Sequence, residues 1–307
     1  MAKSKTPTSK QSTEPSVVVP NTVLSLTFPW KQVEPEYQKV LKRLAKQLHI
    51  QGFRKGMVPA HIAEQQLKSE AIIEPVLQAL LPEAYTNLLK KEEKKPIADP
   101  EFVPKTVEKG ADWLVEVQIA EKPAVDVSEY LKIAKNAKKE ALAHIAEEAK
   151  KKDQPKDKKV TAEEEKQHQE DHILQHMFQD FVQTIKPAIP ELLVKQQTRR
   201  ELERLVQELR SMKLTLDDFL QRNNQTFEQL TGSIATRSLG QLQLEFILQA
   251  ITEKLGITVD QTEIDTLFAK TADEKHRKEQ QNDVRYQDAA RVHLTRKKLF
   301  DHLLEIK

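Results

Sequence analysis

The 307-residue sequence contains no cysteine. This absence excludes disulfides and cysteine-ligated metal sites, and it suits a reducing compartment. Glycine is scarce, with six residues in the whole chain, and aromatic residues make up only 5%. Hydrophobic residues account for 38% and charged residues for 31%, which is less apolar and more charged than an average domain. We therefore expect slender helical elements rather than a thick core.

Long apolar runs are missing as well. Residues 1–15 have no apolar segment of the kind found in secretory signals, and nowhere does an apolar run reach the roughly 18 residues that a membrane-spanning helix needs. We expect a disordered tail over residues 1–15, no membrane partner, and a cytoplasmic protein. The net charge of +2 excludes a uniformly basic coat for nucleic acid but leaves room for local basic patches.

Apolar spacing predicts a small α+β domain over residues 16–133. Alternation over 23–28 and again over 113–119 indicates strands, and apolar residues three and four apart over 34–48 indicate an amphipathic helix. A longer helix is predicted over 71–91, where two internal prolines should start, kink or divide it.

Residues 134–170 differ in composition from both flanks. Between Lys138 and Glu170 there are nine lysines and nine acidic residues with few apolar ones. We interpret this segment as a charged linker that is partly helical at most. Residues 171–307 return to helical spacing and predict an all-α domain of open, arm-like form. Threonine caps are expected at 215 and 226, a helix start at Asp260, and a helix stop at Gly256.

Two of the six glycines flank one short loop. Gly52 and Gly56 enclose Phe53, Arg54 and Lys55. Flanking glycines allow a tip to reverse direction sharply, so the tip either presents an aromatic ring and two cations to solvent, or buries Phe53 and leaves only the cations solvated.

The helix before this loop adds positive charge. It carries four basic residues that suit docking on an anionic, RNA-rich partner: Lys39, Lys42, Arg43 and Lys46. Seven basic residues against two glutamates give residues 31–56 a net charge of +5.

Catalytic and metal-binding signatures are weak. There is no cysteine nucleophile, nucleophile elbow or phosphate-binding glycine loop, so we predict no catalytic residue and no cofactor. His168, His172 and His176 recur at four-residue spacing, which is compatible with a metal site. Their charge-rich surroundings favour a solvated helix face instead, and we predict no metal.

The loop and its surroundings resemble the trigger factor family of bacterial chaperones, which meet nascent chains at the ribosomal exit tunnel. The family's docking signature is Gly-Phe-Arg-x-Gly-Lys-x-Pro. It stands here over residues 52–59 with one departure, because Met57 replaces the lysine. The sequence around the loop and helical segments such as "IPELLVKQQTRRELERL" and "TRKKLFDHLLE" follow the order of the family, so the resemblance covers most of residues 20–307.

The resemblance implies a fold and a function. It implies a ribosome-binding α+β domain followed by a helical chaperone domain, acting without ATP and docking through residues 52–56. The implied partners are the large ribosomal subunit, both protein and rRNA, and nascent or unfolded polypeptides, with no DNA. Roles in protein transport and cell division are implied too.

One large departure concerns the FKBP-like peptidyl-prolyl isomerase domain that typical members insert between these halves. Such a domain needs on the order of 100 residues. Only 42 residues separate Tyr130 from Ile173, and none of them is aromatic. We therefore expect a form without that domain and no enzyme activity. A helical ribosome- or RNA-associated adaptor that holds no clients, and an isomerase that uses other residues, remain as alternatives.

Overall fold

The computed structural model describes residues 17–51, 53–54, 56–151, 161–271 and 283–306. The chain divides into two compact units. The α+β unit comprises Val18–Lys122 and Pro190–Gln197, and the helical unit comprises Pro123–Ile189 and Thr198–Lys307. The tail predicted over residues 1–15 lies outside the described residues.

A three-stranded antiparallel sheet forms one layer of the α+β unit. Its strands are β2 (Thr22–Phe28), β4 (Trp113–Ile119) and β3 (Glu101–Thr106), in the spatial order β2-β4-β3. Every second residue of β4, starting at Trp113, is fully buried, as the alternation of a one-sided sheet requires. The strands predicted over 23–28 and 113–119 are confirmed.

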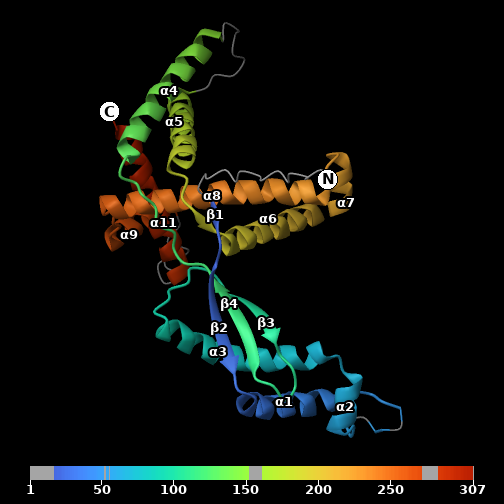
Figure 1. Cartoon of the computed structure of the whole chain (residues 1–307). Coiled ribbons are helices and arrows are strands. Elements are labelled where there is room, and N and C mark those ends of the chain that lie inside the picture. Colours follow the sequence, from blue (N-terminus) through green and yellow to red (C-terminus); the bar gives the residue numbers. More distant parts are fainter. Residues whose placement is uncertain (1–16, 52, 55, 152–160, 272–282, 307) are drawn as a thin grey trace, which may run out of the picture. The chain divides into compact units, whose positions relative to one another are not determined.

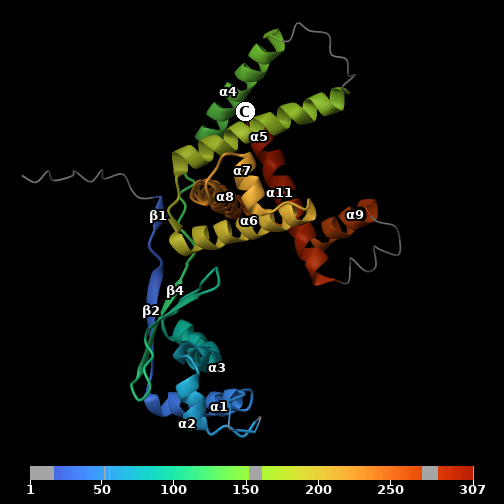
Figure 2. The ribbon, with the colours of Figure 1, turned by 90° about the vertical axis from the view of Figure 1, so that its right-hand side faces the viewer.

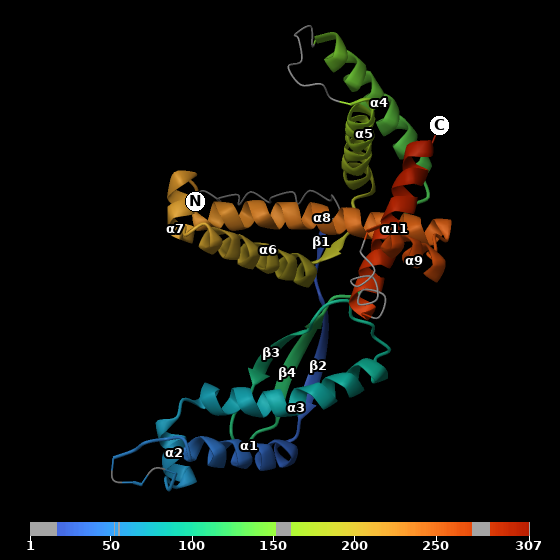
Figure 3. The same ribbon diagram turned by 180° about the vertical axis from the view of Figure 1, so that it is seen from behind.

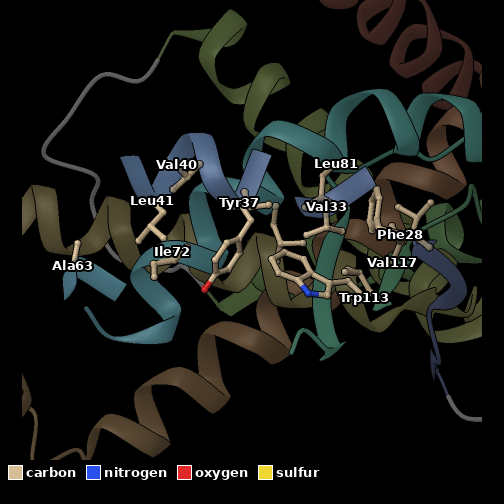
Figure 4. Close-up of a cluster of buried hydrophobic side chains, with 14 of the residues drawn as sticks. Phe28, Val33, Tyr37, Val40, Leu41, Ala63, Ile72, Leu81, Trp113 and Val117 are labelled. Carbon is tan, nitrogen blue, oxygen red and sulfur yellow. The ribbon is translucent and has the colours of Figure 1, made fainter. Parts of the chain in front are cut away.

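Helices cover one face of this sheet, as Figure 2 shows. They are α1 (Trp30–Ala45), α2 (Ala60–Gln66) and α3 (Ser69–Lys91). The core lies between the two layers. In Figure 4, Val33, Tyr37 and Leu41 of α1 gather with Trp113 of β4 and Ile72 of α3. Burial of this apolar set holds α1 and the loop that follows it against the sheet.

The prolines of α3 neither start nor divide it, which corrects two of the three predicted effects; a kink stays a prediction. Pro75 and Pro82 both lie inside one continuous helix. A proline inside a helix costs about 3 kcal/mol through the lost hydrogen bond and steric conflict. The buried neighbours of the two prolines offset that cost; they are Ile72, Val76, Leu77 and Leu81.

The helical unit is built from a series of helices, shown in Figure 1 with labels that follow the chain. Their bounds are α4 (Tyr130–Lys151), α5 (Ala162–Ile185), α6 (Glu191–Ser211), α7 (Leu216–Arg222), α8 (Phe227–Leu255), α9 (Gln261–Thr271) and α11 (Val284–Glu305). The start of α6 belongs to the α+β unit. Two short strands, β1 (Val18–Val19) and β5 (Ile189–Pro190), complete the described elements. The observed α+β domain followed by an all-α domain confirms the predicted fold class.

Side-chain caps define several helix ends. Capping boxes, in which a threonine hydroxyl and the side chain three residues on exchange hydrogen bonds with the backbone, begin α5, α7 and α8 at Thr161, Thr215 and Thr226. The helix α8 ends at Gly256, whose φ of 63° lies in the left-handed region that glycine tolerates. The predicted ends at 215, 226 and 256 are confirmed, and α9 follows Asp260 as expected.

The segment predicted to be a charged linker is largely helical, which corrects that prediction. Residues 134–151 and 162–170 belong to α4 and α5, and these two helices pack on each other. Ala134, Ala137 and Ala141 of α4 are fully buried in the core of the helical unit. Small side chains at helical spacing therefore provide the apolar face that the charge count conceals.

Two domain boundaries also differ from the expected ones. Residues 123–133 join the helical unit, because Val127 and Tyr130 are buried in its core. Residues 190–197 join the α+β unit. There the side-chain oxygen of Asn21 accepts a hydrogen bond from the backbone N–H of Leu192 at 2.7 Å, and Lys195 pairs with Glu101 at 2.6 Å.

Within the part of the chain that the structure describes, none of the helices has an apolar stretch sufficient to cross a lipid bilayer.

Candidate functional site

Figure 3 shows the loop that joins α1 to α2, and two backbone hydrogen bonds close turns in it. The backbone N–H of Phe53 donates to the carbonyl of Ile50 at 3.1 Å, and the N–H of Met57 donates to the carbonyl of Arg54 at 2.9 Å. Gly56 has a φ of 82°, a left-handed conformation that is strained for any residue with a Cβ atom. The second turn therefore depends on glycine at this position.

The side chains of the loop divide between core and solvent. Phe53 is half-buried and packs against the core of the α+β unit, whereas Arg54 is exposed and Met57 is 70% exposed. A tip that offers the whole phenyl ring to solvent is therefore not what the structure shows. Part of the ring supports the loop, and the cation lies outside. Gly52 and Lys55 lie outside the described residues.

The predicted basic face of α1 is exposed. All four of its residues, Lys39, Lys42, Arg43 and Lys46, point to solvent. Lys39 pairs with Glu36 at 3.2 Å, and Lys42 and Arg43 lie in the last turn of the helix. Cations near a helix C-terminus also stabilise the helix by about 0.3–1 kcal/mol through its dipole. The charges thus have a local role besides the docking role predicted for them.

A hydrogen-bonded triad that the sequence analysis missed supports α2, the helix after the loop. The hydroxyl of Tyr37 in α1 donates to Glu64 of α2 at 2.8 Å. Lys109, in the turn before β4, donates to the same carboxylate at 2.9 Å. The three residues are 27 and 45 positions apart, so no local pattern points to the triad.

The triad shifts the ionisation of its members. Burial, and then the hydrogen bond and charge of Glu64, raise the pKa of Tyr37 to about 12. The hydrogen bond from Lys109 holds the pKa of Glu64 below its usual value, despite an opposing effect of burial. Both shifts favour the neutral phenol beside the charged carboxylate, which is the form in which the triad is fully bonded.

The histidines group differently from the predicted set. His172 and His176 are half-buried on α5 and come together with His144 of α4, whereas His168 is exposed and lies outside this group. The preference for a solvated helix face is therefore corrected for His172 and His176. His144 could not be found from spacing, because it is brought in by the packing of α4 on α5.

The helical unit contains a groove lined by α6, α7 and α8. Its volume is about 430 Å³, and its apolar lining comes from Leu205, Phe219, Leu230 and Ile234. Charged residues of α6 and α8, including Arg204 and Glu208, edge it. Two exposed apolar side chains flank α7 in the chain: Met212 is 67% exposed and Phe227 is 51% exposed. Such surface is available for weak apolar contacts with a partner.

Two descriptions of known protein families together match nearly the whole chain. The family description "Bacterial trigger factor protein (TF)" matches residues 11–154, and "Bacterial trigger factor protein (TF) C-terminus" matches residues 153–305. A sheet-and-helix N-terminal domain followed by a helical C-terminal domain is thus a trigger factor arrangement. The chain belongs to the trigger factor family. The two matches adjoin, which agrees with the expected absence of an inserted isomerase domain.

Individual relatives agree with this family. The trigger factor of Streptococcus pneumoniae strain JJA is 34% identical over 128 residues, and that of strain Hungary19A-6 is 33% identical over 128 residues. Each alignment covers 41% of this chain but only 30% of the relative. A solved structure, described as showing promiscuous substrate recognition in folding and assembly activities of the trigger factor chaperone, shares the fold. Its TM-score is 0.54 at 13% identity, with 93% of this chain and 97% of that chain covered.

The triad predicts an acid-dependent contribution to stability. Because the pKa of Glu64 is lower in the folded state, its contribution is present above the unfolded value of about 4.3 and is lost as the pH falls through the folded value. We expect Glu64→Gln to lower the free energy of unfolding at pH 7 by about 1 kcal/mol or less, since Lys109 is partly solvated. The difference from the unmodified protein should shrink as the pH falls below 4.

Urea unfolding at a series of pH values, followed by tryptophan fluorescence, measures this effect. The matched control is Glu83→Gln, which changes an exposed glutamate of α3. An equal pH dependence for both variants would contradict a role for the triad.

Proposed function

We propose that the protein is an ATP-independent, ribosome-associated molecular chaperone. In this proposal the loop of residues 52–56 docks on the large ribosomal subunit beside the exit tunnel. The helical unit holds nascent or unfolded polypeptides and limits their aggregation. Docking on ribosomes places the activity in the cytoplasm. The observation that carries the proposal is the match of both trigger factor descriptions to a chain whose loop presents an exposed cation.

Charge supports the docking half of the proposal. Arg54 and the basic face of α1 are exposed on consecutive segments of one unit. Such cations bind phosphate oxygens, and binding of this kind releases counterions from RNA. The half-buried ring of Phe53 keeps the loop against the core, so its cation is presented from a supported position.

The apolar surface of the helical unit supports the holding half. The groove of α6, α7 and α8 and the exposed side chains Met212 and Phe227 offer several separate apolar contacts. Many weak contacts suit clients that share no sequence, and the flexible thioether of methionine adapts to different shapes. A client leaves when it buries its own apolar surface, so no nucleotide is needed for release.

The docking loop gives the first test of function. Changing Arg54 and Lys55 together to alanine should weaken co-sedimentation with ribosomes at least tenfold, about 1.4 kcal/mol, because charge-assisted contacts are lost. Higher salt should weaken binding of the unmodified protein. Phe53→Ala is tested separately, since removal of a half-buried ring also costs the domain about 1–2 kcal/mol. Undiminished binding of the Arg54/Lys55 variant, with its unfolding curve unchanged, would contradict the proposed docking.

Met57 allows the opposite test, a gain of binding. Met57 is 70% exposed, so the lysine of the family signature fits there without disturbing the core. We expect Met57→Lys to tighten ribosome binding and to steepen the slope of log affinity against log salt by about one. Gln221→Lys adds the same charge at an exposed site on α7 and should change neither quantity. Equal effects of the two variants would mean that only net charge matters.

The holding surface is tested by suppression of aggregation without nucleotide. The double variant Met212→Ser with Phe227→Ser should bind an unfolded client about fivefold more weakly, which corresponds to ~1 kcal/mol. The control variant, Val284→Ser with Tyr286→Ser, removes apolar side chains of similar exposure from α11. If both variants hold clients equally well, α7 and its flanks are not the holding surface.

The same assays separate the alternatives. Retained docking with no suppression of aggregation by the unmodified protein would favour the helical adaptor. A prolyl-peptide isomerisation assay decides whether other residues supply isomerase activity, and we expect none.

A further inference from the structure

Three histidines meet on the two helices that occupy the charged segment. His144 lies on α4, and His172 and His176 lie on α5. One ring nitrogen from each lies within 4.8 Å of the others. The ring centroids are 4.8 Å apart for His172 and His176, 5.4 Å for His144 and His172, and 6.0 Å for His144 and His176.

The fold explains why these rings converge. Residues four apart share one face of a helix, so His172 and His176 project from α5 in the same direction. The packing of α4 on α5 brings His144 onto that face. His172 and His176 are half-buried and His144 is exposed, and Nδ1 of His172 is shielded from solvent. The cluster is therefore accessible from one side and supported by the helices on the other.

We propose that His144, His172 and His176 bind one divalent transition metal ion of the Zn²⁺ class. Neutral imidazole nitrogen is a preferred ligand of Zn²⁺, Ni²⁺ and Cu²⁺, and three histidines with one open position form a known type of zinc site. The chain lacks cysteine, so thiolate ligands are excluded, and a set of histidine nitrogens is a form of zinc site that remains open to it.

The distances are compatible with this site after a small movement of the side chains. Zinc–nitrogen bonds of about 2.0–2.1 Å in tetrahedral geometry place ligand nitrogens roughly 3.3 Å apart. The nitrogens, now within 4.8 Å, must approach by about 1.5 Å at most, which small rotations of the three side chains can supply. Water would fill the fourth position.

Metal binding at this point would fasten α4 to α5. Two ligands come from one helix and the third from the other, so the bound ion opposes separation of the pair. The proposal is independent of client holding and ribosome docking. It assigns a binding site to the α4–α5 helix pair, which includes most of the charged segment of residues 134–170.

Calorimetric titration with ZnCl₂ tests the site directly. The probe is added to full-length, untagged protein that has been treated with a chelator. We expect one ion per chain. His144→Ala should lower the affinity at least about tenfold, because even a group that only orients a ligand typically contributes that much. His168→Ala, an exposed histidine of the same helix, is the matched control and should leave the affinity unchanged.

A second measurement covers variants with altered folding. Zn²⁺ should raise the melting temperature of the unmodified protein and of His168→Ala, but not that of His144→Ala or His176→Gln, each with circular dichroism matching the unmodified chain. Absence of zinc binding would overturn the proposal. Binding that survives His144→Ala undiminished would also overturn it, because a pair on α5 alone would then be sufficient.

Discussion

Burial of one face of α1 determines where the proposed docking surface lies. Val33, Tyr37 and Leu41 fill the space between the sheet and α3, so the rotation of α1 about its axis cannot change without exposing them. The opposite face, with Lys42 and Lys46, is thereby directed to solvent. The same packing positions the loop after the helix. The hydrogen bond from Tyr37 to Glu64 then links α1 to α2 on the other side of the loop. The charge recognition that we propose for this surface therefore depends on apolar burial on the other side of α1.

The charged segment shows how little apolar surface a helix pair needs. Ala134, Ala137 and Ala141 contribute small side chains at helical spacing, while lysine and glutamate occupy the solvent side. A capping box at Thr161 fixes the start of α5. The charged residues lie on the outer face of the pair, and the alanines that pack inside add little to the apolar count. The composition of the segment therefore predicted a linker.

Local patterns predicted the local features. Alternation located β2 and β4, and threonine caps and Gly256 located helix ends, because each depends on residues within a few positions. Features built from distant residues were not predictable in this way. His144 joins His172 across a helix pair, and Lys109 reaches Glu64 across 45 positions. Start or division of α3 at its prolines was a wrong prediction for a related reason, since buried residues on both sides of them favour one continuous helix. For the candidate loop, the sequence identified the residues but left open which side chain supports the turn.

Phe53 imposes a limit on how the loop can vary. The half-buried ring of Phe53 fills space in the core, so a side chain of another size there would disturb the packing. Arg54 and Met57 are exposed and do not have this requirement. Substitutions that tune recognition can therefore accumulate at the exposed residues at little cost to folding, and a change at Phe53 alters both properties at once. The thioether of Met57 stands at one of the permissive positions. The loop thus combines one half-buried side chain that anchors it with exposed side chains that can vary.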